Sequence, residues 1–155
     1  MAAVDRFLST AGVADGELEI RHMDASTRTA PEAAAAVGCD VRQIVKSLVF
    51  MADGEPVLAL VSGDHRLDVD RLRAHVGAAD VRRATADEVR AHTGFAIGGV
   101  PPFGHPAPLR TVLDIGLRRD DVVWAAAGTP FAVFAIAPEA LVAWADAEEA
   151  EVAAG

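Results

Sequence analysis

The sequence contains one cysteine, Cys39, which follows Gly38 at the end of a predicted helix. A single thiol excludes an internal disulfide and a thiolate metal cluster, and we interpret Cys39 as structural rather than reactive. The five histidines are dispersed, and none forms a His-x-x-x-His pair with a neighbouring carboxylate, which argues against a zinc site. We therefore expect no metal.

The motifs of several common enzyme classes are also missing. No glycine-rich loop ends in Gly-Lys-Ser or Gly-Lys-Thr, and no Gly-x-Gly-x-x-Gly opens a helix, so a nucleotide phosphate cradle has no support. No Gly-x-Ser-x-Gly elbow occurs, and the one cysteine lies far from any obvious histidine partner. We expect neither a cofactor nor a nucleophilic triad.

Long hydrophobic runs are absent as well. Hydrophobic residues make up 52% of the chain, but they occur in runs far shorter than the roughly 20 residues that a bilayer span requires. The first nine residues include Asp5 and Arg6 and lack the basic start and apolar centre of a secretory signal. The sequence predicts a cytoplasmic protein without a membrane partner, and its 155 residues fit one domain.

Positive charge is in deficit, with 14 basic against 23 acidic residues and a formal net charge of −9. This balance argues against non-specific nucleic-acid binding through bulk charge, so any such contact must be local. Six arginines fall within 25 residues, and the sequence leaves open whether they form one basic face or are scattered over the surface: Arg66, Arg71, Arg73, Arg82, Arg83 and Arg90.

Lysine is rarer still, because Lys46 is the only one among the 14 basic residues. Arginine is always charged and fork-shaped, whereas lysine is a compact point charge whose pKa moves on burial. Lys46 also precedes the apolar run from Leu48 to Met51, where a basic residue is out of place. Either the lysine occurs at this position by chance, or the position requires an ammonium group.

Capping residues and apolar periodicity predict the helices and strands. Helices are expected over 2–11, from Thr29 to Gly38, from Asp68 to Gly77, from Thr85 to Gly94 and from Pro138 onward. Strands are expected at 18–22, 44–51, 56–62, around Val81, and at 111–115, 122–127 and 131–136, with Asp53-Gly54 as a hairpin turn. This order predicts an α+β fold with a mixed sheet and helices packed around it. We expect a single domain over 1–145 and an acidic tail over 146–155 that becomes disordered after the last helical turn.

The segment from Gly98 to Gly104 is too rich in glycine and proline for a regular element. Its free N–H groups at Gly99 and Val100 are candidates to face a bound oxygen, because glycine allows close backbone approach. Backbone donors with an ammonium nearby would form an electrostatic device for acyl transfer. The alternative is a loop that only turns the chain.

Several of these segments carry a resemblance to a known family. They are the Thr29-Ala30-Pro31-Glu32 helix start, the strand Lys46-Ser47-Leu48-Val49-Phe50, Ser62-Gly63-Asp64, Thr93-Gly94-Phe95, Gly98-x-x-x-Pro102 and Ala127-Gly128-Thr129. Over roughly residues 20 to 145 the sequence resembles the YbaK/EbsC family, which includes the editing domain inserted in bacterial prolyl-tRNA synthetases. The resemblance implies a mixed, partly barrel-like β-sheet surrounded by helices.

The resemblance also implies a function. Family members cleave the ester between a small amino acid and the 3′-terminal adenosine of tRNA, using water or groups of the substrate, and need no metal. Lys46 would be the essential catalytic residue, and Gly98, Gly99, Val100, Pro101 and Pro102 would form the loop that binds the substrate carbonyl. Further substrate contacts are expected from Gly128, Thr129 and Phe131, and tRNA contacts from Arg66, Arg82 and Arg83. The expected partners are the acceptor end of an aminoacyl-tRNA and an aminoacyl-tRNA synthetase.

Two departures from the family leave the substrate open. The acidic residue that some members place on the strand after Gly128 is apolar here, near Val133, and Phe131 stands where many relatives have histidine. Alanyl- or cysteinyl-tRNA for proline is the first expectation, and seryl- or threonyl-tRNA is the next. The rival functions are a non-catalytic module that binds a tRNA or nucleotide end, and a hydrolase of some other small ester.

Overall fold

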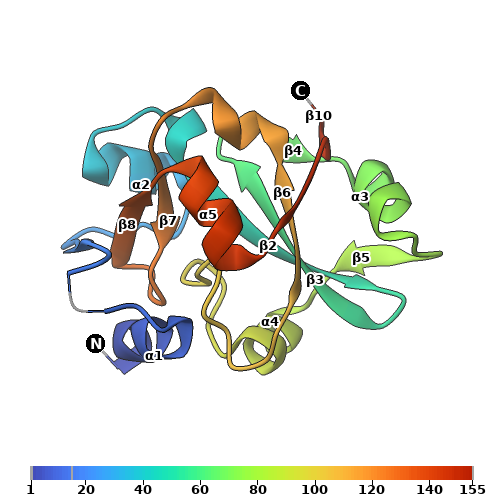
Figure 1. The fold of residues 1–155 in the computed structure, drawn as a ribbon, viewed down its shortest axis with the longest axis horizontal. Coiled ribbons are helices and arrows are strands. Elements are labelled where there is room, and N and C mark those ends of the chain that lie inside the picture. Colours follow the sequence, from blue (N-terminus) through green and yellow to red (C-terminus); the bar gives the residue numbers. More distant parts are fainter. Residues whose placement is uncertain (1, 15, 155) are drawn as a thin grey trace.

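The structure is a computed structural model that describes residues 2–14 and 16–154 (Figure 1). Its helices are α1 (Ala2–Ala11), α2 (Ala30–Val37), α3 (Val69–Val76), α4 (Ala86–Thr93) and α5 (Pro138–Ala145), with 3-10 helices η1 (Val41–Gln43) and η2 (Ile115–Arg119). Its strands are β1 (Ile20–His22), β2 (Val45–Ala52), β3 (Glu55–Ser62), β4 (Arg66–Leu67), β5 (Val81–Arg83), β6 (Arg110–Asp114), β7 (Val123–Ala126), β8 (Ala132–Ile136), β9 (Glu148–Ala150) and β10 (Ala153–Ala154). The predicted mixed α+β fold is confirmed.

Capping boxes begin two of the helices, as the sequence predicts. The Thr29 hydroxyl accepts a hydrogen bond from the Glu32 backbone N–H, and the Glu32 carboxylate accepts one from the Thr29 N–H. Thr85 and Glu88 make the same reciprocal pair at the start of α4. Each pair satisfies two backbone donors that a helix start would otherwise leave free.

The largest sheet has five strands in the order β5-β2-β3-β6-β9. Strands β2 and β3 form the predicted antiparallel hairpin, and its turn residues Asp53 and Gly54 have φ values of 50° and 83°. Positive φ at both central residues is typical of the turn that matches the twist of a two-residue hairpin. Strand β6 lies parallel to β3, and β9 lies parallel to β6. Strand β5 pairs only with the last part of β2, from Phe50 to Ala52.

The five-stranded sheet separates two hydrophobic cores. On one face, Leu72 of α3 packs with Phe50 and Val61, and all three are nearly inaccessible to solvent. The other face packs against α1, α4, α5 and a second sheet in the order β1-β8-β7 (Figure 1). Phe7 and Phe134 stack there with ring centroids 5.4 Å apart. Because both faces are covered, β2 and β3 read as almost continuous apolar runs.

The segment after α5 is ordered, so the expectation of a disordered acidic tail is wrong. Strand β9 pairs with β6, and β10 pairs antiparallel with β4. Between them Val152 is fully buried, and the carboxylate of Asp114 accepts hydrogen bonds from the backbone N–H groups of Val152 and Ala153 at 2.9 and 3.1 Å. These contacts compensate for the chain entropy that ordering the segment costs.

The acidic residues of β9 also have partners that are distant in sequence. Glu148 accepts hydrogen bonds from Arg110 at 2.8 and 3.0 Å, and Glu149 pairs with Arg118. The tail is therefore attached to arginines of β6 and η2. The local composition of the tail shows only its acidic residues and not their distant partners. Composition alone therefore predicts disorder.

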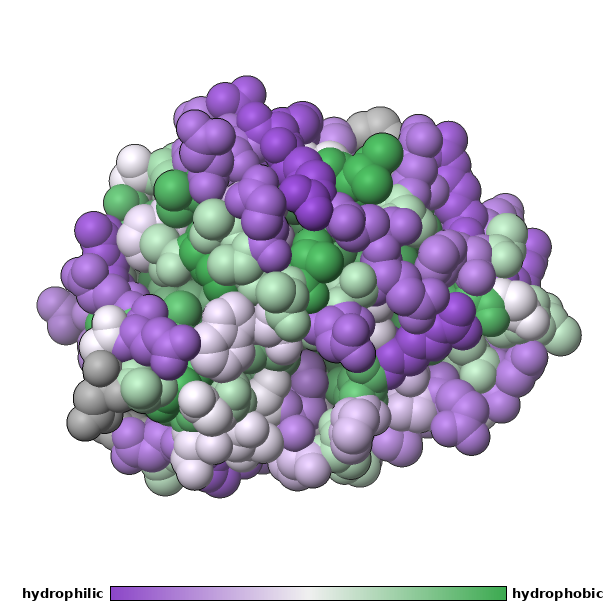
Figure 2. All heavy atoms as spheres, viewed as in Figure 1, coloured by the Kyte–Doolittle hydropathy of each residue, from purple (hydrophilic) through white to green (hydrophobic). Residues whose placement is uncertain are grey.

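None of the described helices has both the length and the apolar composition that crossing a bilayer would need. Figure 2 shows hydrophilic side chains over much of the visible face, with smaller apolar areas between them.

Candidate functional site

A cavity of about 400 Å³ lies beside the first half of β2. Strand β5 pairs with β2 only from Phe50 onward, so the edge of β2 before that point is not covered by β5. The walls come from β2, the start of α2, the loop before Val100 and strands β7 and β8; they include Thr27 to Pro31, Ile44 to Val49, Arg83, Ile97, Gly98, Val100, Trp124 to Ala126 and Val133. Lys46, Gly98 and Val100 thus line one cavity, although about 50 residues separate them.

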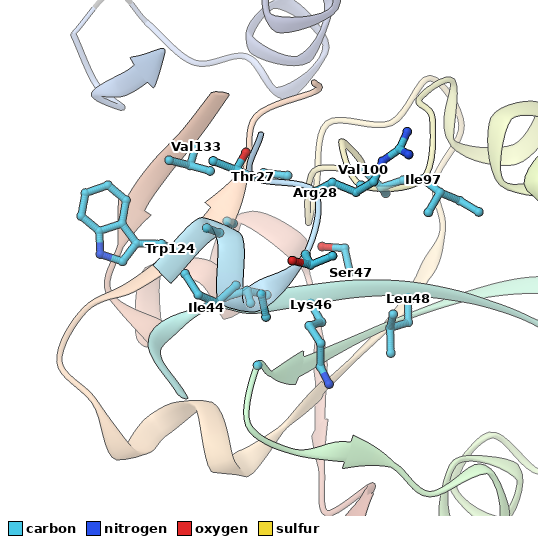
Figure 3. A pocket seen from close by; sticks show the side chains of 18 of the residues that line it. Thr27, Arg28, Ile44, Lys46, Ser47, Leu48, Ile97, Val100, Trp124 and Val133 are labelled. Carbon is cyan, nitrogen blue, oxygen red and sulfur yellow. The ribbon is translucent and has the colours of Figure 1, made fainter. Parts of the chain in front are cut away.

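Successive side chains of β2 point to opposite faces, and this alternation divides the candidate residues. Val45 and Val49 belong to the core that contains the β7-β8 sheet, while Leu48 packs against the α3 core. Ser47 lies on the side of β2 that faces Val100, and the Lys46 side chain extends away on the other side (Figure 3). The cavity reaches both sides because it lies across the edge of the strand, where it contacts Lys46 and Leu48 as well as Ser47.

The Ser47 hydroxyl is the polar side-chain group that stands out in this cavity. Its Oγ atom is buried, and no hydrogen-bond partner for it exists among residues 2–14 and 16–154. A buried hydroxyl without a partner costs about 1–3 kcal/mol, so native proteins rarely keep one without a reason. Ser47 is therefore positioned to hydrogen-bond a ligand in the cavity.

The main-chain groups of Ser47 lie in the plane of the sheet and point to the strand edge that borders the cavity. The Val49 carbonyl accepts a hydrogen bond from the Ala84 N–H at 3.0 Å, so the backbone groups of Val49 point to the β5 side. Backbone groups alternate along a strand, and those of Ser47 must point to that side too. At Ser47 this side is occupied by the cavity, which gives a ligand access to one backbone donor and one acceptor.

The Lys46 ammonium donates a hydrogen bond to the backbone carbonyl of His65. Burial lowers the pKa of Lys46 below its usual value of 10.5, and Arg83 and Arg66 lower it further, while Asp64 opposes them. Asp64 is held by Arg119 and by the Ser62 hydroxyl, each at 2.8 Å. The bond to Arg119 is the main reason that the pKa of Asp64 falls to about 2. Lys46 is thus a half-buried cation, and the Asp64 carboxylate that acts on its charge stays ionised at pH values well above 2.

The loop from Gly98 to Pro102 differs in part from the sequence expectation. The Gly99 N–H donates to the Ala96 carbonyl at 2.9 Å, so it is not free to face a ligand. Pro101 and Pro102 are buried and do not line the cavity, and the Pro101 carbonyl contacts His105 Nε2 at 2.8 Å. The expectation of free donors at both Gly99 and Val100 is therefore wrong for Gly99, because the loop closes a turn on itself. Gly98 and Val100 are the loop residues that reach the cavity.

Gly128 and Thr129 pack against this loop, and neither they nor Phe131 line the cavity. A side chain on Gly99 would come within 2.9 Å of the Thr129 Cα and 3.0 Å of the Gly128 carbonyl, so the two segments are in close contact. Phe131 is 48% exposed and, like Gly128 and Thr129, does not line the cavity. The residues of β7 and β8 that form the cavity wall include Trp124 and Val133.

The profile of the aminoacyl-tRNA editing domain matches residues 24–143. The chain belongs to the aminoacyl-tRNA editing domain family.

Relatives and a solved structure agree with this assignment. The uncharacterized protein YwhH of Bacillus subtilis (strain 168) is 32% identical over 126 residues, which cover 81% of this chain and 80% of YwhH. A proline–tRNA ligase of Geobacter sp. (strain M21) is 40% identical over 87 residues, or 56% of this chain, and the match spans only 15% of the ligase. The crystal structure of a proposed trans-editing enzyme for prolyl-tRNA synthetase superposes with a TM-score of 0.91 at 47% identity, covering 100% of this chain and 99% of that one.

Three of the six arginines from 66 to 90 have acidic partners within this editing domain. Arg71 pairs with Asp68, the N-cap of α3, Arg73 pairs with Asp70 of α3, and Arg82 binds Glu88 through two bonds of 2.7 Å. Arg83 differs from its neighbour, because it lines the cavity with its guanidinium 5.7 Å from the centre of the Phe50 ring. Arg66 lies close enough to Lys46 to affect its pKa. Of the three arginines predicted to bind tRNA, Arg83 is the one at the cavity.

Sequence reasoning missed Ser47, Arg28 and Trp124 as cavity residues of the editing domain. Ser47 is next to the predicted catalytic lysine. Because successive side chains of a strand point to opposite faces, the sequence could have predicted that Lys46 and Ser47 face away from each other. Arg28 precedes the predicted N-cap of α2. Its place at the start of that helix could therefore have been predicted from the sequence, although its place at the cavity could not. The residues around Trp124 form no motif that would have predicted its place in the cavity wall.

No group of three or more His, Cys, Asp or Glu residues in the described part of the chain is arranged to hold a metal ion. Cys39 lies outside the cavity, and burial raises the pKa of its thiol, the opposite of what activates a cysteine nucleophile.

Proposed function

We propose that this editing domain hydrolyses mischarged aminoacyl-tRNA as a free-standing enzyme. The observation that carries the proposal is the position of Lys46, Gly98 and Val100 around one small cavity at the edge of β2. The cavity volume of about 400 Å³ suits a small amino acid and part of a ribose, within the usual range of ligand sites.

In the proposed reaction the aminoacyl group enters the cavity beside Ser47 and Val100, and the ester lies at the β2 edge. A water oxygen bonds to the ester carbonyl carbon, the bond from that carbon to the ribose oxygen breaks, and the proton from water ends on the ribose oxygen. Negative charge develops on the carbonyl oxygen during the attack. A fixed cation and backbone N–H groups stabilise such charge more than they stabilise the neutral ester, which accelerates the reaction.

Lys46 is the proposed source of that cation. Its ammonium is held at the His65 carbonyl on the far side of β2, so the ester must reach the strand edge for the two to interact. Lys46 and Leu48 both contact the cavity, which supports a path to that edge. Arg83, at the same cavity, is the proposed contact for tRNA phosphate.

The proposed substrates are alanyl- or cysteinyl-tRNA for proline, followed by seryl- or threonyl-tRNA. The similarity to prolyl-tRNA ligases and to a proposed trans-editing enzyme for prolyl-tRNA synthetase supports tRNA for proline and a synthetase as partner. The Ser47 hydroxyl is suited to contact the amino group or a polar side chain of the amino acid.

A second candidate function is a non-catalytic module that binds the tRNA end. The direction of the Lys46 ammonium, toward the His65 carbonyl instead of the Ser47 side, favours this alternative. The deciding experiment measures amino-acid release from a panel of mischarged tRNAs by the purified protein. Turnover well above spontaneous hydrolysis supports the enzyme, whereas tight binding of the tRNA without turnover supports the module.

A further inference from the structure

Arg28 lies at the rim of the cavity, between two residues that are fixed in place. Thr27 donates hydrogen bonds to the Pro130 carbonyl from its backbone N–H at 2.6 Å and from its hydroxyl at 2.8 Å. On the other side, Thr29 is the N-cap of α2. The backbone of Arg28 is therefore held on both sides, so the point from which its side chain starts is fixed relative to the cavity before a ligand binds.

The stem of Arg28 crosses the loop at Gly98. A Cβ atom at Gly98 would lie 2.6 Å from Arg28 Cγ, and Gly98 adopts a φ of 89°, a region that favours glycine. In Figure 3 the Arg28 side chain lies on the same side of β2 as Ser47 and Val100. The absence of a side chain at Gly98 thus provides the space for the arginine stem, and the packing directs its guanidinium along the rim.

The Arg28 guanidinium is free of protein partners within residues 2–14 and 16–154. Among the residues that the structure describes, no carboxylate or carbonyl oxygen forms an ion pair or hydrogen bond with it, whereas Arg42, Arg82 and Arg119 all have carboxylate partners. Within the described chain, Arg28 shares this lack of a carboxylate partner with Arg83, which also lines the cavity, and with Arg90, which does not. An exposed arginine with a packed stem is suited to bind an external anion, and its planar fork matches phosphate oxygens.

We propose that Arg28 binds the 5′-phosphate of the nucleotide that carries the amino acid. The inference rests on the proposed function, in which the aminoacyl ester lies in the adjoining cavity. The phosphate of that terminal nucleotide is the anionic group nearest to the ester along the chain. A cation at the rim of the cavity is placed to meet it, whereas base edges and ribose offer no negative charge. Arg28 would then position the substrate by its backbone, independently of tRNA sequence.

Two minimal substrates isolate this contact: the alanyl ester of adenosine, and the same 2′(3′)-ester of adenosine 5′-monophosphate. We expect the unmodified protein to prefer the phosphorylated ester in kcat/KM by about ten- to a hundredfold, as for a hydrogen bond to a charged group. In Arg28→Gln the preference should fall to near one, through KM and with kcat nearly unchanged. Arg90→Gln is the matched control, since Arg90 is also exposed, also lacks an ion pair among the described residues and does not line the cavity. It should keep the full preference.

Retention of the preference in Arg28→Gln would overturn the inference, and so would the absence of any preference in the unmodified protein. Binding of adenosine 5′-monophosphate and of adenosine, followed by NMR titration, tests Arg28 without turnover. If neither ester is hydrolysed but the monophosphate binds at least tenfold more tightly than adenosine in an Arg28-dependent manner, the proposed function fails while the phosphate site stands. Circular dichroism checks that each variant is folded.

Discussion

Lys46 and Ser47 are adjacent in sequence, yet their side chains lie on opposite sides of β2, with the ammonium at the His65 carbonyl and the hydroxyl facing the cavity. This arrangement separates the two groups that a serine–lysine nucleophilic pair would bring together, because such a pair needs hydrogen-bond contact. The separation agrees with water as the nucleophile in the proposed reaction, in which the two residues have different roles. Ser47 is suited to bind the amino acid, and Lys46 to stabilise charge at the strand edge.

Replacing Lys46 tests whether positive charge alone is sufficient. The half-buried ammonium contacts the His65 carbonyl, and a broad planar guanidinium cannot occupy the same place. We expect Lys46→Arg and Lys46→Ala to lose deacylation by similar factors, on the order of a hundredfold or more, because small misplacements of a catalytic group have effects of this size. Single-turnover deacylation measures the loss, and circular dichroism checks the fold. Near-normal turnover in Lys46→Arg would remove Lys46 from the proposed mechanism.

The pH dependence of the Lys46 contribution follows from its environment. Burial lowers the pKa of Lys46, so its ammonium loses the proton at a pH below 10.5. If the charged form is required, the rate attributable to Lys46 must decrease as pH rises through that lowered pKa. The measurement is the deacylation rate from pH 7 to 10, corrected by the rate of Lys46→Ala at each pH. A corrected rate that rises steadily with pH would mean that Lys46 acts as a neutral base.

Removal of the Ser47 hydroxyl should separate activity from stability. Because Ser47 Oγ is buried without a partner in the described part of the chain, Ser47→Ala should leave the free energy of unfolding unchanged or raise it by up to about 1 kcal/mol. Deacylation should fall by about tenfold, the value of one hydrogen bond to substrate. Ser62→Ala is the matched control, since the Ser62 hydroxyl contacts the Arg42 carbonyl at 2.6 Å and should cost about 1 kcal/mol of stability when removed. Urea unfolding and steady-state kinetics provide the two readouts.

Arg83 and Arg82 are neighbours with different surroundings, which makes them a natural pair for testing tRNA contact. Arg83 lines the cavity, while Arg82 is bound to Glu88 through two hydrogen bonds. We expect Arg83→Gln to raise KM for aminoacyl-tRNA several-fold and to flatten its salt dependence, with kcat nearly intact. Arg82→Gln should have a much smaller effect. Equal increases of KM in the two variants would indicate that tRNA responds to the total positive charge of β5 and not to the position of Arg83.

Asp64 should contribute to the loss of stability in acid. Its pKa is about 2 in the folded protein against an ordinary 3.8, mainly because Arg119 donates to it. A carboxyl with a lowered pKa stabilises the fold at pH values above 3.8, and that contribution disappears as pH falls through about 2. Urea unfolding at pH 5, 4, 3 and 2 should therefore show a steeper decline for the unmodified protein than for Asp64→Asn. Parallel declines would assign acid sensitivity to other carboxyls, such as Glu88.

The sequence predicted most helices because their boundaries depend on local chemistry. The caps at Thr29 and Thr85 and the hairpin turn at Asp53 involve contacts within a few residues. The tail escaped prediction because its order depends on Asp114 and on arginines that lie more than 30 residues away. The composition of a segment does not show which distant residues it contacts.

The site was predicted less completely than the fold. Strand β2 contributes apolar side chains to a core on each face, so it lacks the polar and apolar alternation that would have shown which side of Lys46 and Ser47 faces a ligand. The Gly99 N–H was assigned to a ligand because a sequence does not show that the loop bonds back to Ala96. Arg28 was overlooked because its importance depends on the space left by Gly98, 70 residues later.

The cavity also has a consequence for biosynthesis. Its walls join Thr27 and Arg28 with Val133, and β1 pairs with β8, so contacts across more than 100 residues must form before the cavity exists. Such a high contact order implies slow folding compared with a helical bundle of this length. During translation, the early segments must wait until β8 has emerged from the ribosome. The nascent chain would therefore acquire the cavity late, and a shorter fragment that ends before β8 should lack the complete cavity and with it the binding of the proposed substrate.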